Sequence, residues 1–317
     1  MLATFNGANF LEPLVQSVQQ QSYSNWRVLA RDDCGSDGTA AMLDLWAQRD
    51  SRVTRVKDDQ GRLGSATNFI TLMRIARDQG AQYFAFCDQD DIWRPDKLAL
   101  LITKVHELER RRTDRVPCLV WSDLRWIDER DQTMSESHFR SSSGPLALAG
   151  GGNWLLAMNL VPGCAMLGNR RLLEMAAGAA EGVRHHDWWT ALIASAAGET
   201  GVVRHALVDY RLHASNQIGA ATRSQRVLQL VRKPSAMLRR SAHTYWESVR
   251  QARMLMRQES LDLNPGWAEW IEHTCDRLGA SAPSRRIFAT LAGPVRRVGI
   301  LRNLLMFIDA ARRPPGP

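Results

Sequence analysis

Short apolar runs alternate along the chain with longer segments whose apolar residues recur every three to four positions. Short runs bounded by turn residues are typical of buried strands, and the wider spacing is typical of helices with one buried face. Over the first two hundred residues this alternation predicts an α/β fold, with a mostly parallel sheet and helices on both faces. Strands are predicted at 1–5, 27–30, 53–56, 83–87, 118–121 and from 202, with helices at 10–18, 40–46, 69–76, 95–108, 172–177 and 185–195.

The predicted strand from Tyr83 to Cys87 runs directly into Asp88, Gln89, Asp90 and Asp91. Three carboxylates this close repel one another unless a cation or several hydrogen-bond donors compensate them. Oxygen ligands suit Mg²⁺ or Mn²⁺, ions that often hold substrate phosphates. In open α/β sheets, ligands bind just outside the carboxyl ends of the strands. A solvated acidic turn that caps the next helix is the alternative, but the buried strand favours a metal and diphosphate site.

Length and composition are those of a folded protein with a full core: 317 residues, 44% hydrophobic and 23% charged. The five cysteines are an odd number without Cys-x-x-Cys spacing, so neither a disulfide framework nor a zinc site is indicated. A reducing cytoplasm is therefore the expected location, with a peripheral position on the inner face of the membrane left open. The N-terminal residues lack the pattern of a signal peptide, and no apolar run approaches the roughly 20 residues of a membrane span.

The charge of the chain is unevenly distributed. Residues 223–317 hold 17 basic and 7 acidic residues, whereas residues 1–222 hold 24 and 26. This predicts a catalytic α/β domain over 1–222 and a basic, mainly helical extension over 223–317. Within it, Arg296-Arg297 and Arg312-Arg313 flank an amphipathic pattern over 298–308. Binding to an anionic membrane and packing on the catalytic domain are both open interpretations. Nucleic-acid binding is disfavoured because no reading module accompanies the charge.

Six short motifs along residues 1–222 resemble those of one known family. They are Ala-Thr-Phe-Asn-Gly (3–7), Arg-Asp-Asp-Cys-Gly-Ser-Asp-Gly-Thr (31–39), Gly-Ser-Ala-Thr-Asn-Phe (64–69), Asp-Gln-Asp-Asp-Ile-Trp (88–93), His-Asp-Trp-Trp (186–189) and Tyr-Arg-Leu-His-Ala-Ser-Asn-Gln-Ile-Gly (210–219). Each motif is weak alone, but six in the right order are strong. Together they resemble family 2 inverting glycosyltransferases with the GT-A fold, in particular the bacterial rhamnosyltransferase-like group that acts on surface polysaccharides.

The resemblance implies a hexosyl or deoxyhexosyl transferase that uses a nucleotide-sugar donor with Mg²⁺ or Mn²⁺. The acceptor would be a hydroxyl of a glycan or lipid-linked precursor. Carried over residue by residue, it implies Thr4, Asp33 and Asn68 as nucleotide-sugar contacts, Asp88 at the ribose or metal, Asp90 as the main metal ligand, His213 near metal and diphosphate, and Asp187 as catalytic base. An inverting transfer needs such a base on the acceptor side and charge neutralisation on the leaving diphosphate.

Several of these residues have a structural interpretation as well. Asp187 is also a favoured N-cap residue, and His213 also suits a structural hydrogen bond. Trp188 and Trp189 are acceptor-side candidates that stack on sugar rings, although one of them is expected in the core. Two further acceptor-side candidates are Gly163 and Cys164. Asp32 is expected to bind a backbone amide or an arginine rather than substrate.

The sequence departs from the family pattern in two places and leaves other functions open. The first strand is short, and Cys34-Gly35 stands where the family usually has Gly-Ser. The Gln-x-x-Arg-Trp pattern of processive synthases is not seen, which favours single transfers. One alternative is a non-catalytic sugar-nucleotide-binding or scaffold subunit. The other is a nucleotidyltransferase, which is disfavoured because no Gly-rich, Arg-containing pyrophosphate loop lies near the N-terminus.

Overall fold

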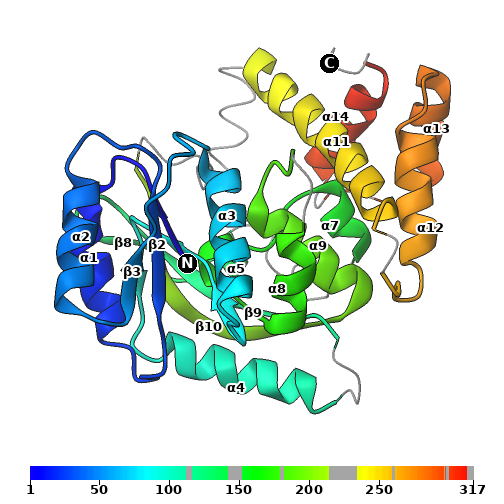
Figure 1. Cartoon of the computed structure of the whole chain (residues 1–317). Helices are drawn as coiled ribbons and strands as arrows, with labels where there is room; N and C mark the ends of the chain where they lie inside the picture. The colour runs from blue at the N-terminus through cyan, green and yellow to red at the C-terminus, as the bar shows by residue number, and fades with distance from the viewer. Residues whose placement is uncertain are drawn as a thin grey trace. The chain divides into compact units, whose positions relative to one another are not determined.

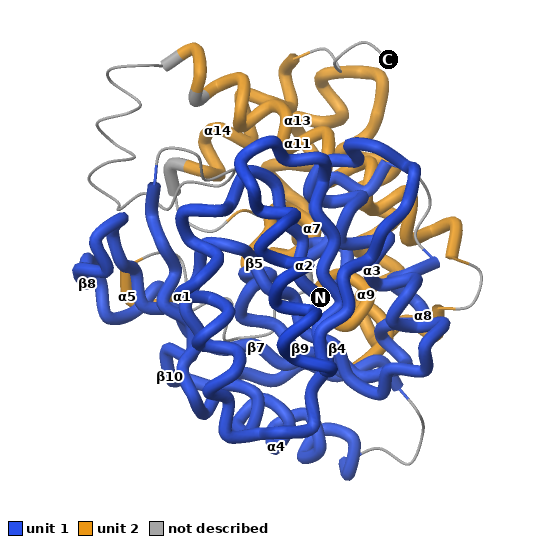
Figure 2. Tube along the Cα trace, turned by 60° about the vertical axis from the view of Figure 1, so that its left-hand side comes forward, with its two compact units in different colours: residues 1–138, 161–190, 199–219 blue, residues 139–160, 191–198, 220–317 orange. Residues whose placement is uncertain are grey.

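A computed structural model describes residues 1–111, 116–141, 152–178, 182–213, 234–258, 261–295, 297 and 300–312. The chain forms two compact units, which Figure 2 shows in blue and orange. Unit 1 comprises residues 1–138, 161–190 and 199–219, and unit 2 comprises residues 139–160, 191–198 and 220–317. The division predicted at residue 222 placed 139–160 and 191–198 in the first domain. In the structure these segments group with the C-terminal helices, because α7 (Gly152–Ala157) packs against α11 (Pro234–Met256) and α12 (Trp267–Glu272).

The first sheet of unit 1 is parallel and has four strands in the order β3-β2-β1-β5. Its strands are β1 (Leu2–Thr4), β2 (Val28–Asp32), β3 (Val53–Arg55) and β5 (Cys87–Asp88). Helices α1 (Ala8–Gln19) and α2 (Thr39–Arg49) lie on one side, and α3 (Ser65–Asp78) lies on the other (Figure 1). The α/β fold predicted from the alternating pattern is confirmed.

The second sheet of unit 1 is mostly antiparallel, which the sequence pattern did not indicate. Its strand order is β4-β9-β7-β10-β6, and β8 pairs with β7. The strands are β4 (Tyr83–Ala85), β6 (Ile92–Trp93), β7 (Cys118–Ile127), β8 (Thr133–Ser135), β9 (Met166–Asn169) and β10 (Glu199–Arg211). Within this sheet, β7 and β10 are the only described strands that pair in parallel, and the other pairs are antiparallel. Helix α4 (Lys97–Glu109) packs on β7, β9 and β10, and α8 (Arg170–Ala177) packs on α3.

The strand predicted over 83–87 is broken at Phe86, where the chain leaves one sheet and enters the other. Residues 83–85 pair with β9, whereas Cys87 and Asp88 pair with β1. Phe86 is fully buried at the crossing. Because β1, β2 and β5 are parallel, their carboxyl ends meet at one edge, with Ala3 beside Asp88 and Thr4 beside Asp32. This edge carries the polar motifs.

The N-terminus of α1 is held by the loop that follows β2. Asp37 accepts a hydrogen bond from the Ala8 N–H, and the Thr39 hydroxyl accepts one from the Gly7 N–H, both at 2.9 Å. These two bonds satisfy donors that the first turn of a helix leaves without an intrahelical partner. The loop after β2 is thereby fixed to the loop after β1, so the motifs at 3–7 and 31–39 are held together at this edge of the sheet.

Unit 2 consists of helices. Besides α7, α11 and α12, it holds the π-helix η2 (His273–Leu278), α13 (Pro283–Ala292) and α14 (Ile300–Ala310). The short helix α5 (His138–Ser141) and helix α9 (His186–Ala197) each have residues in both units. No described helix is both long enough and apolar enough to cross a membrane. Of the predicted amphipathic tail pattern, Arg296, Val298 and Arg313 lie outside the described residues.

Candidate active site

The ends of β1 and β2 are joined by short hydrogen bonds. The Thr4 hydroxyl donates to the Asp32 carboxylate, and the Asp33 N–H donates to the Thr4 carbonyl, both at 2.8 Å. The other oxygen of Asp32 accepts from the Gly35 N–H at 2.8 Å. Asp32 therefore binds a backbone amide, as expected from the sequence. Thr4 and Asp33 are buried, and their predicted contacts with a nucleotide base stay predictions.

The Asp33 carboxylate holds the loop that precedes α3. One oxygen accepts from the Leu63 N–H at 2.7 Å and from Arg31 at 3.1 Å, and the other accepts from the Gly64 N–H at 2.8 Å. A carboxylate offers about four acceptor positions. Three are used by described residues, so a further donor, such as a base N–H, has one acceptor position available.

Arg31 is a buried residue of this region that the sequence reasoning did not single out. Its guanidinium binds Asp58 through two bonds of 2.8 and 2.9 Å and the Gly61 carbonyl through one of 2.9 Å. The remaining donors reach Asp33 and, at 3.4 Å, the Asn68 side chain. All five N–H donors are used, which fixes residues 58–64 beside the strand ends. A charged residue directly after the apolar run 28–30 was the available signal.

Asn68 lies behind that loop rather than at its surface. Its side chain is 1% exposed, and its amide donates to the Arg31 carbonyl at 3.2 Å. These contacts give Asn68 a structural role on α3. Its predicted contact with a nucleotide sugar is not supported by the geometry, because the amide faces Arg31.

Gln89 attaches the acidic loop to the end of β1. Its side-chain amide pairs with the backbone of Phe5, accepting from the N–H at 2.8 Å and donating to the carbonyl at 3.0 Å. A Cβ atom on Gly7 would lie 2.2 Å from the Gln89 Oε1 atom, so this contact requires glycine at position 7. Gln89 thus places the flanking carboxylates Asp88 and Asp90.

Asp90 and His213 are 123 residues apart in sequence and in contact in the structure. The His213 Nε2 atom lies 2.7 Å from Asp90 Oδ2, and the imidazole stacks on Phe10 with ring centroids 4.9 Å apart. The structure thereby brings together two of the three predicted metal ligands. Residues 214–219, the rest of the late motif, lie outside the described residues.

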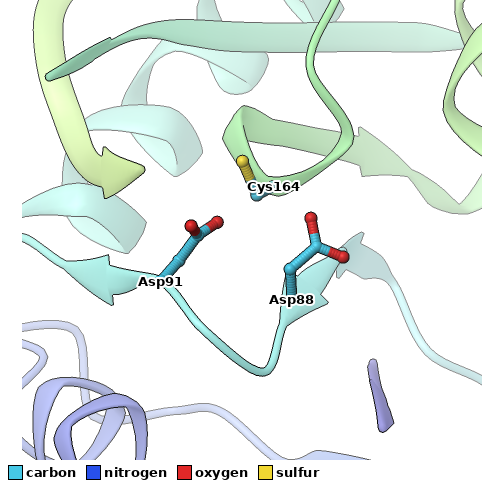
Figure 3. Close-up of side chains that lie close together, drawn as sticks. All are labelled: Asp88, Asp91 and Cys164. Carbon is cyan, nitrogen blue, oxygen red and sulfur yellow. The ribbon is translucent and has the colours of Figure 1, made fainter. Parts of the chain in front are cut away.

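Asp88, the third predicted ligand, lies with Asp91 and Cys164. Their potential ligand atoms are all within 4.8 Å of one another, and Figure 3 shows the three side chains facing a common space. Burial, followed by the charges of Asp90 and Asp187, raises the pKa of Asp88 to about 7. Burial, followed by Asp90 and Asp88, also raises the pKa of Asp91 well above its ordinary value. Such shifts are typical of buried carboxylates that lie close to one another.

The donor set fits a hard divalent ion better than a soft one. Two carboxylates supply the oxygen ligands that Mg²⁺ and Mn²⁺ prefer. Burial raises the pKa of the Cys164 thiol well above its ordinary value, so the thiol stays neutral and is a poor ligand. A cation here would be held by Asp88 and Asp91, with Asp90 next to them in the same loop.

Lys97, also missed from the sequence, is fully buried near this cluster. Its ammonium donates to the Cys164 carbonyl at 2.6 Å and lies 3.2 Å from the centroid of the Trp93 ring. Burial lowers the pKa of Lys97 to about 8. At neutral pH its remaining charge offsets part of the repulsion among the carboxylates. Nothing in the sequence indicated that Lys97 is buried, because a lysine in the first turn of a helix is usually exposed.

Asp187, the predicted base, belongs to the same site. It lies in the first turn of α9, is 9% exposed, and accepts from the Trp188 N–H at 2.7 Å. A Cβ atom on Gly163 would lie 3.1 Å from the Asp187 Cβ, so the absence of a side chain at 163 leaves room for this carboxylate. The charge of Asp187 raises the pKa of Asp88, which places the two carboxylates within one electrostatic neighbourhood.

His186 is packed behind Asp187. Its ring stacks on Phe69 at 3.9 Å and meets Phe86 edge-on at 4.5 Å. Burial lowers the pKa of His186 to about 4, so the imidazole is neutral at physiological pH. The buried Nε2 atom lacks a hydrogen-bond partner among the described residues.

Comparison with known proteins supports this assignment of motifs. Residues 1–111 match the profile of the family described as Glycosyl transferase family 2. The match covers 111 of the 317 residues of the chain. The chain is 22% identical over 223 residues to the dTDP-rhamnosyl transferase RfbG of Shigella flexneri, an alignment covering 69% of this chain and 74% of RfbG.

Other curated relatives match the chain over shorter stretches. Among them is the Escherichia coli UDP-Glc:alpha-D-GlcNAc-diphosphoundecaprenol beta-1,3-glucosyltransferase WfgD, which is 29% identical over 103 residues. That alignment covers 32% of this chain and 38% of WfgD. For the first relatives compared, the chain spans between 10% and 37% of the relative's length.

Solved structures show that the chain has the GT-A fold. The mannosyltransferase PcManGT of Pyrobaculum calidifontis, solved with GDP-Man and Mn²⁺, superposes with a TM-score of 0.55 at 20% identity. The alignment covers 98% of this chain and 78% of PcManGT. TarS 1–349 of S. aureus, solved with UDP-GlcNAc, gives a TM-score of 0.58 at 13% identity and covers 98% and 88% of the two chains.

One group of predicted site residues needs correction. Trp188 and Trp189 are 2% and 0% exposed, so neither ring has a face available to a sugar. Both belong to the core, where helix α9 buries its apolar side chains, although the sequence interpretation put only one there. Gly163 and Cys164 do lie beside Asp187 and Asp88, but contact with an acceptor stays a prediction for both.

Proposed function

We propose that the chain transfers a hexosyl or deoxyhexosyl group from a nucleotide-sugar donor to a hydroxyl of a glycan or lipid-linked precursor, with inversion at the anomeric carbon. The observation that carries the proposal is the convergence of Asp187 with the acidic loop 88–91 at the carboxyl edge of the parallel sheet. Relatives that act on rhamnosyl and diphosphoundecaprenol-linked substrates support the polysaccharide context. The proposal includes a cytoplasmic location.

On the donor side, the strand-end loops would bind the nucleotide diphosphate. Asp33 would accept from the base, and Thr4 would line the same edge. Asp88, Asp90 and His213, with Asp91 added by the structure, would hold Mg²⁺ or Mn²⁺. When bound, the ion would neutralise charge on the diphosphate leaving group. Mn²⁺ with a nucleotide sugar in PcManGT supports this assignment.

On the acceptor side, Asp187 would accept the proton from the attacking hydroxyl. A positioned general base contributes about 10²–10⁴-fold to the rate. One oxygen of its carboxylate accepts from the Trp188 N–H, which orients the group. The neutral His186 behind it adds no positive charge that would weaken the base.

The test separates donor binding from transfer. A thermal-shift panel of UDP-, GDP- and dTDP-linked sugars, with and without Mn²⁺, first identifies the donor, since a ligand of the folded state raises stability. Asp187→Asn is then expected to keep the donor-induced shift and to lose transfer by about 10²–10⁴-fold. Asp90→Asn is expected to lose the Mn²⁺-dependent shift itself. The exposed Asp59→Asn makes the same charge change elsewhere and serves as control.

Three results would contradict the proposal. Undiminished transfer by Asp187→Asn would remove it as base and direct attention to Asp123 or Glu136. An unchanged metal-dependent shift in Asp90→Asn would show that the metal site is misplaced. Donor binding by the wild type without transfer to any glycan or lipid-linked acceptor would favour the non-catalytic binding subunit.

A further inference from the structure

Helices α13 and α14 of unit 2 expose large apolar side chains. Phe288 and Leu291 on α13 are 71% and 60% exposed, and Leu304 on α14 is 56% exposed. Phe307 and Ile308 on α14 are exposed as well. These five make up most of the large apolar side chains that are exposed among the described residues. Scattered exposed apolar residues are normal, but their concentration on two helices that pack together marks an interaction surface.

The exposed residues follow the helical repeat. Positions 288 and 291 are three residues apart, and positions 304, 307 and 308 have the spacing of one helix face. The opposite faces are buried, through Ala289 on α13 and Leu305 and Met306 on α14. Each helix is therefore apolar on both sides, and only one side is covered by unit 2.

Unit 2 places charged groups inside this apolar exterior. Arg297 and Asp309 form an ion pair with side chains 5% and 0% exposed, and both bind Ser241. Arg286 is 1% exposed and donates to the carbonyls of Ala280, Ser281, Ala310 and Arg312. In water the usual order is the reverse, with charges outside and large apolar groups inside. Buried charges beneath exposed phenylalanines suit an outer face that meets a nonpolar medium.

The charge around this surface favours a lipid over a second copy of the chain. From residue 279 to the end, the sequence has seven arginines, of which Arg286 and Arg297 are buried, and a single acidic residue, Asp309. Because Asp309 pairs with the buried Arg297, this segment has no described carboxylate to offset its other arginines. Two copies meeting here would bring like charges together, whereas an anionic bilayer attracts them at about 1 kcal/mol per basic residue near the surface.

We propose that α13 and α14 lie in the interface of an anionic lipid bilayer, with Phe288, Leu304, Phe307 and Ile308 inserted among the lipid chains. The helices have 10 and 11 residues and are too short to span a bilayer, so they lie in its plane. This surface goes beyond the proposed transferase activity and does not depend on it. It identifies residues through which the protein would be held where lipid-linked substrates lie.

The test uses the full chain and vesicles, because α14 packs on α11 and its removal would expose the core of unit 2. The wild type is mixed with vesicles of phosphatidylcholine alone, or of phosphatidylcholine with about 30% phosphatidylglycerol, and sedimented. The triple variant Phe288→Ser, Leu304→Ser, Phe307→Ser removes exposed apolar groups only. The control variant Leu45→Ser, Met134→Ser removes exposed apolar groups of unit 1. Circular dichroism and thermal melting verify that each variant is folded.

The expected result is pelleting with anionic vesicles that falls at least tenfold in the triple variant and is unchanged in the control. Raising the salt concentration should weaken binding, since salt screens the attraction to the anionic lipids. Equal pelleting of the triple variant and the wild type would overturn the proposal, as would no pelleting of the wild type. Sedimentation velocity covers the second-copy alternative. A wild-type dimer that the triple variant abolishes, without vesicle binding, would assign the surface to self-association.

Discussion

Each unit buries arginines, but the two units use them differently. In unit 1, Arg31 directs all five donors to the loop 58–64, Asp33 and Asn68, and so shapes the edge where the strand ends carry the candidate site. In unit 2, Arg286 binds four backbone carbonyls near helix ends, and Arg297 binds Asp309 and Ser241. Unit 1 thus fixes a loop, whereas unit 2 joins helices.

Backbone strain follows the same division. The described non-glycine residues with positive φ are Asn6, Cys34 and Asp131, and all three lie in unit 1. Such strain collects at functional sites, where neighbouring contacts hold the backbone in place. In unit 1 the cost to stability is backbone strain in loops near the candidate site. In unit 2 the cost is the burial of charged side chains beneath an apolar exterior.

The largest effect is expected when the buried ion pair between Arg297 and Asp309 in unit 2 is broken. Arg297→Met leaves Asp309 buried without its cation, so the free energy of unfolding of unit 2 should fall by about 3–5 kcal/mol. Denaturation by urea, followed by circular dichroism, measures this fall. The double variant Arg297→Met, Asp309→Leu should recover most of the loss, because an uncompensated charge no longer remains. Equal losses in the single and double variants would show that the pair does not act through charge burial.

The next prediction concerns the pH dependence of the stability of unit 1. The folded pKa of His186 is about 4 against an ordinary value of 6.5, because the ring is buried. The contribution of His186 to the free energy of unfolding is fully present above pH 6.5. It is lost as the pH falls toward 4, and the free energy of unfolding then falls by about 3 kcal/mol. His186→Phe should flatten the stability of unit 1 over this range in urea denaturation at several pH values. An unchanged pH dependence would mean that His186 is not buried neutral.

In unit 2 the change of stability with pH has the opposite sign, so the two units should respond differently to acid. Burial raises the pKa of Asp309 above its ordinary value. A raised carboxyl pKa contributes stability at low pH that is lost as the pH rises through the folded value. Acid should therefore weaken unit 1 through His186 and spare unit 2 at Asp309. Asp309→Asn, which cannot titrate, is the matched control.

The smallest expected effect concerns backbone strain at Cys34 in unit 1. Cys34 has φ 63° at the position where the family usually has glycine, and the left-handed region costs a non-glycine residue about 1–2 kcal/mol. Cys34→Gly should relieve part of this cost and stabilise unit 1 by about 1 kcal/mol, measurable as a raised melting temperature. Cys34→Ser keeps the Cβ atom and a side chain of similar size, and should leave stability within about 0.5 kcal/mol of the wild type. Equal melting temperatures for all three proteins would show that no strain is stored there.

The sequence predicted the parts of the site that depend on strand order. Thr4, Asp33 and Asp88 follow strands, and the carboxyl ends of parallel strands meet at one edge. The family resemblance put both Asp90 and His213 near the metal and diphosphate. The contacts that orient these groups were not predictable in the same way. Gln89 was visible only as a polar residue between acids, and its pairing with Phe5 depends on the geometry of two loops. Lys97 and Arg31 are charged residues whose burial no periodicity reveals.

The misjudged residues share a physical cause. Trp188 and Trp189 follow a catalytic candidate, and their amphipathic rings suit both sugars and cores. Only the packing around α9 decides between the two, and it buries both. The break at Phe86 was hidden for a similar reason, because an unbroken apolar run looks the same whether one sheet or two sheets receive it. Long-range packing decided each of these cases.

The contact between His213 and Asp90 also sets an order of events during synthesis. The histidine is made 123 residues after the aspartate. At about 5–20 residues per second, the ribosome delivers it roughly 6–25 seconds later. Over that interval the nascent chain carries its three adjacent carboxylates without the histidine. The candidate site is therefore one of the last parts of unit 1 to be completed.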